Sequence, residues 1–199
     1  MKPLLLKPSK SGNISHLIGK YGMKLFGWKV EGSLPDIPQM VITAAPHTSN
    51  WDFLYMMGAA FTLRAKFSWM GKDNLFKGPF GFVMRWLGGL PVNRRVRTNL
   101  VAQVIEHFHS NKKLILVIPP EGTRKKTDHW HTGFYYIARE AEVPLVLAYI
   151  DYKSKTVGIG PTIYPSGDIQ ADIEIIKPFY SQFTGKHPER MGEIRINPK

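Results

Sequence analysis

Three short, continuous apolar segments constrain the fold of this chain most strongly. They are residues 40–45, 114–118 and 144–150, and aliphatic side chains dominate each of them. Segments of this length are too short for buried helices and suit strands that are covered on both faces. Strands of that kind are typical of parallel sheets, whose two faces are packed against helices.

Segments with helical periodicity alternate with these strands. We predict helices over 51–63, 98–108 and 133–142, and one more from residue 169 that Pro178 bends or ends. Shorter strands are predicted at 67–70 and 156–159. The alternation predicts one α/β domain with a mixed, mostly parallel central sheet that is flanked by helices.

The N-terminal region carries the pattern of an amphipathic helix between residues 14 and 26, with Lys20 and Lys24 off its apolar stripe. The stripe consists of Ile14, Leu17, Ile18, Tyr21, Leu25 and Phe26. We favour a helix whose stripe packs on the core over one that lies in a membrane surface. The predicted division is therefore an N-terminal helical segment, 1–35, and a main domain, 36–199.

The charge of the chain predicts a partner that carries phosphate. The 27 lysines and arginines outnumber the 15 acidic residues, for a net charge of +12, which suits nucleic acid, anionic lipid or phosphorylated substrates. The absence of cysteine excludes a thiol nucleophile and thiolate zinc sites. The longest strongly apolar stretch, 53–63, is shorter than the roughly 20 residues that span a bilayer, so we expect no transmembrane helix.

The first candidate for chemistry is the pair His47 and Asp52, where a buried strand gives way to a helix. With His47 in the loop and Asp52 in the first helical turn, the two side chains could meet. A carboxylate bound to one imidazole nitrogen leaves the other nitrogen free to act as a general base. Alternatively, Asp52 only caps backbone N–H groups at the start of the helix.

Two further groups of residues could bind an anionic or polyol substrate. The strand 114–118 is followed by a carboxylate, a glycine that permits close backbone approach, a hydroxyl and a cation, which belong to Glu121, Gly122, Thr123 and Arg124. Arg94 lies in an arginine cluster, and arginine makes bidentate contacts to phosphate. Either group alone is also compatible with a solvated basic turn.

The order of these motifs resembles the lysophosphatidic acid acyltransferase family, which shares an H-x-x-x-x-D motif. His47 and Asp52 match its first block, Arg94 its second, residues 121–124 its third and residues 143–146 its fourth. The resemblance implies that His47 is the base and Asp52 orients it, while Arg94, Glu121 and Arg124 hold the acceptor. It implies acyl-CoA or acyl-carrier protein as donor and a lysolipid or glycerol phosphate as acceptor.

The implied reaction needs no cofactor and no metal, because a thioester is already activated. We expect backbone N–H groups near Ser49 to stabilise the oxyanion. We also expect peripheral binding to the inner, cytoplasmic face of a membrane through the basic surface and the aromatic region 76–86, with no nucleic acid as partner.

The sequence departs from the family pattern at two places. Both differences bear on which acceptor the protein uses more than on which reaction it catalyses. Pro91 and Val92 stand where the second block usually has an aromatic residue and an isoleucine, and His131-Thr132-Gly133 replaces a lysine before glycine.

Two other functions remain open. One is a basic module that binds nucleic acid or an anionic membrane without catalysis. The other is a metal-dependent hydrolase that uses the residues 128–131, of sequence Asp-His-Trp-His.

Overall fold

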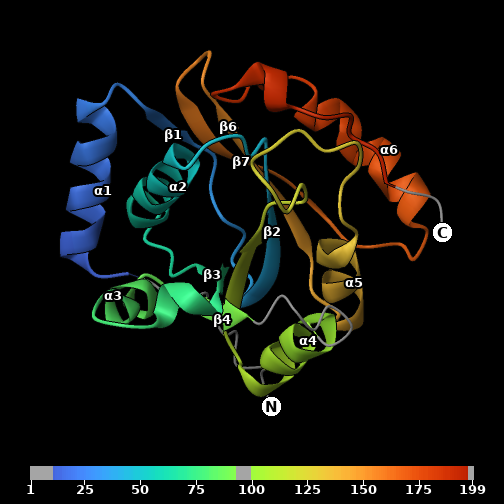
Figure 1. The fold of residues 1–199 in the computed structure, drawn as a ribbon, viewed down its shortest axis with the longest axis horizontal. Coiled ribbons are helices and arrows are strands. Elements are labelled where there is room, and N and C mark those ends of the chain that lie inside the picture. Colours follow the sequence, from blue (N-terminus) through green and yellow to red (C-terminus); the bar gives the residue numbers. More distant parts are fainter. Residues whose placement is uncertain (1–10, 93–99, 197–199) are drawn as a thin grey trace.

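A seven-stranded sheet in the order β1-β7-β6-β2-β5-β3-β4 forms the centre of the molecule in the computed structural model, which describes residues 11–92 and 100–196 (Figure 1). β6 and β7 are antiparallel, and every other neighbouring pair is parallel. The α/β class and the mostly parallel sheet are therefore confirmed. The strands are β1 (Lys29–Glu31), β2 (Gln39–Ala45), β3 (Ser68–Lys72), β4 (Gly89–Val92), β5 (Leu114–Ile118), β6 (Leu145–Asp151) and β7 (Thr156–Ile163).

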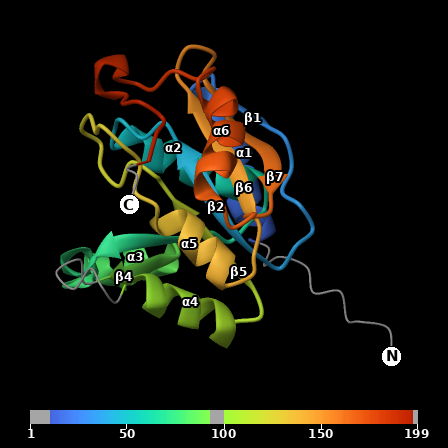
Figure 2. The ribbon, with the colours of Figure 1, turned by 90° about the vertical axis from the view of Figure 1, so that its right-hand side faces the viewer.

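Helices cover both faces of this sheet. α1 (Asn13–Leu25) and α2 (Trp51–Thr62) lie on one side, while α4 (Leu100–Ser110), α5 (Gly133–Glu140) and α6 (Ile169–Tyr180) lie on the other (Figures 1 and 2). The short helix α3 (Phe80–Trp86) follows the 3-10 turn η1 (Asp73–Phe76) next to β3 and β4. A second 3-10 turn, η3 (Pro188–Arg190), lies near the C-terminus.

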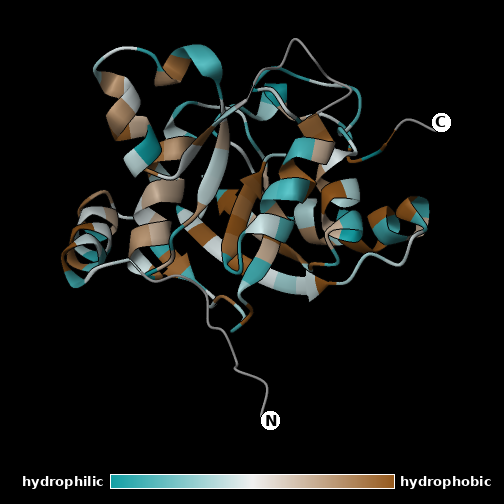
Figure 3. Ribbon diagram, turned by 90° about the horizontal axis from the view of Figure 1, so that it is seen from below, coloured by the Kyte–Doolittle hydropathy of each residue, from teal (hydrophilic) through white to brown (hydrophobic). Residues whose placement is uncertain are grey.

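The central strands β2, β5 and β6 are mostly apolar because both of their faces are buried (Figure 3). In β2, Met40 and Ile42 belong to the core on the α2 side, whereas Val41 belongs to the core formed with α4, α5 and α6. All three are at most 1% exposed. This double burial explains the continuous apolar run in the sequence.

The elements that the sequence did not predict are short or lie at the edges of the sheet. β1 and β4 are its two outermost strands, and the region 71–90 divides into η1, α3 and β4. Pro178 does not end α6 at once, since the helix continues to Tyr180. A few edge residues without strict alternation carry too little periodicity to be recognised.

α1 packs on α2 through the face that carries Gly19 and Met23, which is not the predicted apolar stripe. A Cβ atom added to Gly19 would lie 2.6 Å from the Cβ of Phe61, and the buried Met23 lies against Gly58. The predicted stripe points outward instead, with Leu25 83% exposed. The prediction that this stripe packs on the core is therefore wrong, because a glycine lets the two backbones approach closely where a large side chain would not.

Candidate active site

Polar side chains gather where β2, β5 and β6 end. His47 follows β2, residues 121–124 follow β5 and Tyr152 follows β6. β2 pairs in parallel with both neighbours, so the three carboxyl ends lie at one edge of the sheet. This is the edge at which ligands bind in open α/β sheets.

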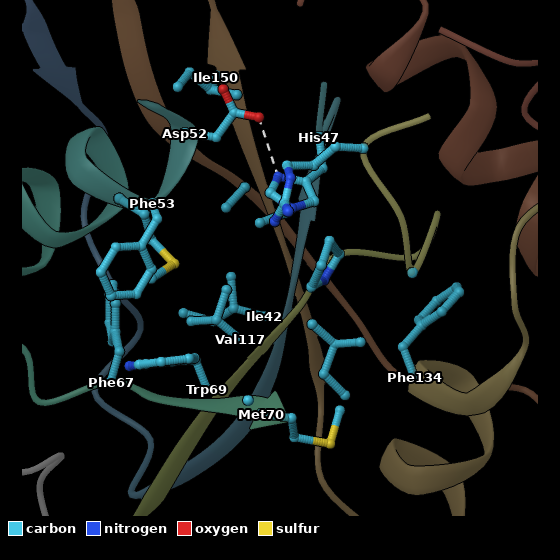
Figure 4. Close-up of a pocket in the computed structure, with 18 of the residues that line it drawn as sticks. Ile42, His47, Asp52, Phe53, Phe67, Trp69, Met70, Val117, Phe134 and Ile150 are labelled. Atoms are coloured by element: carbon cyan, nitrogen blue, oxygen red, sulfur yellow. Dashed lines mark hydrogen bonds and ion pairs between the residues drawn. The ribbon is translucent and has the colours of Figure 1, made fainter. Parts of the chain in front are cut away.

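His47 and Asp52 meet as the sequence spacing predicted. Asp52 is the second residue of α2, and its Oδ2 lies 3.0 Å from Nδ1 of His47 (Figure 4). The same oxygen accepts hydrogen bonds from the backbone N–H groups of Thr48, at 2.9 Å, and Ser49, at 2.8 Å. The capping role and the histidine contact, which were alternatives in the sequence, are thus combined in one carboxylate.

The electrostatic surroundings keep Asp52 ionised. Burial opposes its ionisation, but hydrogen bonds from His47, Tyr152 and the Ser49 N–H outweigh burial and hold the pKa of Asp52 below its usual value. An ionised carboxylate only accepts hydrogen bonds, so Nδ1 of His47 must carry the proton. Nε2 is then the nitrogen with a lone pair for a substrate proton.

Glu121 binds the backbone of the loop that carries His47. Its Oε1 accepts a hydrogen bond of 3.0 Å from the backbone N–H of His47. Its Oε2 is buried and has no hydrogen-bond partner among the described residues. Glu121 lines a separate cavity of about 560 Å³ together with Trp130 and Tyr180, not the larger cavity that contains His47. This geometry favours a supporting role over the predicted contact with the acceptor.

Burial changes the acidity of Glu121. It raises the pKa of this carboxyl from 4.5 to about 7, although the hydrogen bonds from backbone N–H groups act in the opposite direction. The side chain therefore changes charge near neutral pH while it is bonded to the backbone of His47.

The other residues of the third motif face the larger cavity. Gly122, Thr123 and Arg124 line it together with His47 and Asp52, as predicted. Gly122 has a φ of +64°, and a Cβ atom there would lie 2.6 Å from Cδ2 of His131, so the turn requires glycine. Arg94, the residue of the second motif, lies outside the described residues.

The larger cavity has a volume of about 1100 Å³ and a mainly apolar wall, and His47 and Asp52 lie at one end of it (Figure 4). Ile42 and Val117 contribute from the sheet, and Phe67 and Trp69 lie farther along its wall. This volume lies just above the range of about 300–1,000 Å³ that is typical of small-molecule sites. Such a space suits a long apolar chain whose reactive end lies at His47.

Three hydrogen bonds of this site were not predicted from the sequence. The hydroxyl of Tyr152 donates a hydrogen bond of 2.6 Å to Oδ1 of Asp52. From the C-terminal region, the His187 N–H donates to the Thr48 hydroxyl at 3.2 Å, and Arg190 donates to the Thr48 carbonyl oxygen at 3.4 Å. The position of Tyr152 after a parallel strand could have identified it, whereas no pattern points to residues 187–190.

Three of the backbone N–H groups near Ser49, where oxyanion donors were expected, already have acceptors inside the loop. The N–H groups of Thr48 and Ser49 bind Asp52, and the Trp51 N–H donates to the Ser49 hydroxyl. The N–H of Ser49 is thus occupied inside the loop, because Asp52 uses it to orient itself.

The segment 128–131, which was the candidate for a metal site, can now be described, as can the helices that were examined for membrane crossing. The rings of His129 and His131 lie edge to face with centroids 5.7 Å apart, and Trp130 between them is buried. Across residues 11–92 and 100–196, no three histidine or acidic side chains are grouped as metal ligands would be. Over the same ranges, no helix has both the length and the apolar character to cross a bilayer.

Comparisons with known proteins agree with the motifs. A model of the family described as Acyltransferase matches residues 29–151. The chain is 27% identical over 149 residues, 70% of its length, to a 1-acyl-sn-glycerol-3-phosphate acyltransferase of Haemophilus influenzae, and it spans only 60% of that protein. The crystal structure of the 1-acyl-sn-glycerophosphate (LPA) acyltransferase of Thermotoga maritima has a similar fold, with a TM-score of 0.61, 20% identity, and coverage of 85% of this chain and 78% of that one.

Proposed function

Because this chain belongs to the acyltransferase family, we propose that it moves a fatty acyl group from acyl-CoA or acyl-carrier protein to the hydroxyl of a lysophospholipid or glycerol phosphate. The observation that carries the proposal is the hydrogen-bonded pair of His47 and Asp52 at one end of a large apolar cavity. A base beside an apolar channel suits a reaction between a polar hydroxyl and a fatty acyl thioester.

The reaction begins when Nε2 of His47 takes the proton of the acceptor hydroxyl as the oxygen attacks the thioester carbonyl. Asp52 stabilises the imidazolium that forms. The tetrahedral oxyanion then collapses and the carbon–sulfur bond breaks. The thiolate leaves with the proton from the imidazolium, so that an ester and a free thiol are the products.

The cavity wall supports an assignment for each part of the substrates. The apolar side chains Ile42, Phe67 and Val117 would surround the acyl chain. Arg124 lines the same cavity as His47 and would bind the acceptor phosphate, with Thr123 at a polyol hydroxyl. Glu121 would hold the backbone of His47 in place.

The test is the release of free thiol from acyl-CoA and from acyl-carrier protein with a panel of lysolipids and glycerol phosphate. His47→Ala should abolish turnover without loss of the fold, and Asp52→Asn should lower kcat by about 10²- to 10⁴-fold. Near-normal turnover of His47→Ala would exclude this mechanism. Salt-dependent binding of single-stranded DNA without thiol release would support the nucleic-acid alternative instead.

The distribution of exposed apolar side chains supports a membrane surface as the partner. Of the 15 large hydrophobic side chains that are exposed among the described residues, 13 lie between residues 14 and 86. They belong to α1 and its C-terminal cap, to α2, to η1 and to α3, which lie on one side of the molecule (Figure 1). Lys20, Lys24, Lys72 and Lys77 are interspersed with them, and lysines beside apolar residues suit anionic lipid.

α3 connects this surface to the cavity. Phe80, Phe82 and Trp86 of α3 are exposed, whereas Met84 of the same helix lines the cavity. A lysolipid in a membrane that is contacted by α3 would thus be close to the part of the cavity wall that Met84 forms.

Flotation with vesicles of anionic phospholipid at low salt tests the membrane contact. The double variant Phe80→Ser/Phe82→Ser should lose most of its binding. Tyr164→Ser/Ile175→Ser is the matched control, because in the part of the chain that the structure describes these are the two large exposed hydrophobic residues outside the surface. If the wild-type protein ignores the vesicles, or if both double variants bind equally well, the membrane assignment is wrong.

A further inference from the structure

We propose that Tyr152 is a positioning residue for the catalytic pair, holding the carboxylate of Asp52 in the orientation that binds His47. The inference rests on the proposed function. It assigns a role to a residue that belongs to none of the four motifs of the family resemblance.

The two oxygens of the Asp52 carboxylate accept different numbers of hydrogen bonds. Oδ2 accepts three hydrogen bonds, from Nδ1 of His47 and from two backbone N–H groups. Within the described residues, Oδ1 accepts one, the 2.6 Å hydrogen bond from the Tyr152 hydroxyl. The torsion that turns an aspartate carboxylate has broad minima, so Tyr152 is the contact that fixes the plane of the group.

Tyr152 is suited to this role because its hydroxyl stays protonated. Burial and the hydrogen bond to Asp52 both raise the pKa of Tyr152 above its usual value. The hydroxyl thus remains a donor to an ionised carboxylate.

The ring of Tyr152 is fixed independently of Asp52. It packs edge to face on the buried Trp28, with centroids 4.9 Å apart, and on Tyr55 of α2 at 5.9 Å. Its backbone N–H donates to the Thr184 carbonyl oxygen at 2.9 Å. Since Trp28 follows α1 and stacks on Tyr55, three separate parts of the chain determine where this hydroxyl lies.

The matched pair of variants is Tyr152→Phe and Tyr135→Phe. Tyr135 also donates a buried hydrogen bond to an aspartate, Asp172, at 2.7 Å, but it lies on α5 and its partner on α6. Both variants lose a tyrosine–aspartate hydrogen bond and keep the ring. Tyr152→Phe should lower kcat about tenfold with KM changed less than about twofold, whereas Tyr135→Phe should lower the melting temperature and leave kcat unchanged.

A double-mutant cycle separates positioning from general support of the fold. If the hydroxyl acts through the Asp52 carboxylate, Tyr152→Phe should have no further effect on the residual turnover of Asp52→Asn. An equal relative loss in both backgrounds would overturn the inference, as would wild-type turnover of Tyr152→Phe.

Proton NMR of the free protein gives a readout that does not depend on turnover. The proton on Nδ1 of His47, which lies in the hydrogen bond to the carboxylate, should resonate far downfield, and its absence in His47→Ala would assign it. Tyr152→Phe should shift or broaden this resonance and Tyr135→Phe should not. An unchanged resonance in Tyr152→Phe refutes the inference, whereas a wild-type protein that transfers no acyl group refutes the proposed function alone.

Discussion

Replacing Glu121 by glutamine tests whether burial keeps this carboxyl protonated near neutral pH. Oε1 of Glu121 binds the backbone N–H of His47, and Oε2 is buried without a partner among the described residues. Glutamine keeps an oxygen for His47 and carries no charge. Glu121→Gln therefore resembles the protonated form of the wild-type side chain at every pH.

The sign and size of the effect follow from the raised pKa. Burial raises the pKa of Glu121 from 4.5 to about 7 in the folded protein, so the folded state holds the proton over a range in which the unfolded chain has lost it. The contribution of Glu121 to the free energy of unfolding of the wild-type protein then falls as the pH rises from 4.5 to about 7, and it is constant above that pH. The gap between the two pKa values corresponds to roughly 3 kcal/mol.

Urea unfolding followed by circular dichroism, at several pH values between about 5 and 8, measures this effect. Relative to wild type, Glu121→Gln should gain roughly 2–3 kcal/mol in unfolding free energy across that range. Glu140→Gln is the control, because Glu140 is exposed and bonded to Arg139. If the difference between Glu121→Gln and wild type is the same at every pH, Glu121 is ionised throughout and the reasoning fails.

Three further substitutions test the loop, the cavity and the fold. Gly122→Ala should cost about 1–2 kcal/mol in thermal unfolding and lower turnover, because a Cβ atom at φ +64° would meet His131. Val117→Phe narrows the apolar cavity, so the kcat/KM of long-chain acyl donors should fall more than that of short-chain donors in a chain-length series. Asp168→Ala removes the acceptor of two N–H groups at the start of α6 and should cost about 1 kcal/mol in urea unfolding.

The residues of the site that follow β2 and β5 could be predicted from the sequence, because these strands are parallel and buried. β2 and β5 are buried on both faces, so their apolar runs identify them in the sequence, and parallel neighbours must bring their carboxyl ends to one edge. The position of residues 122–124 in the same cavity as His47 follows from that rule. The meeting of His47 with Asp52 follows from their spacing across the junction between β2 and α2.

The remaining part depends on packing that leaves no periodic signal. Tyr152 reaches Asp52 across 100 positions of sequence. Its place after β6 puts it at the same edge of the sheet, but no pattern indicates that the two side chains meet. The outward stripe of α1 was misassigned because Gly19, a residue without a side chain, makes the close helix contact. The resemblance implied that Glu121 holds the acceptor, and no sequence pattern indicated that its Oε1 accepts a hydrogen bond from the His47 backbone.

The central position of β2 explains why two distant residues act on one loop. β5 pairs with one edge of β2 and β6 with the other, in registers that set Thr43 opposite Ile118 and Ala45 opposite Tyr149. Glu121 thus reaches the His47 backbone from one side, and Tyr152 reaches Asp52 from the other. A slip of one residue in either pairing would move that support by about 3.3 Å, more than a hydrogen bond tolerates. The buried side chains that fix the register of the sheet therefore determine the geometry of the base, although none of them touches His47 through a hydrogen bond.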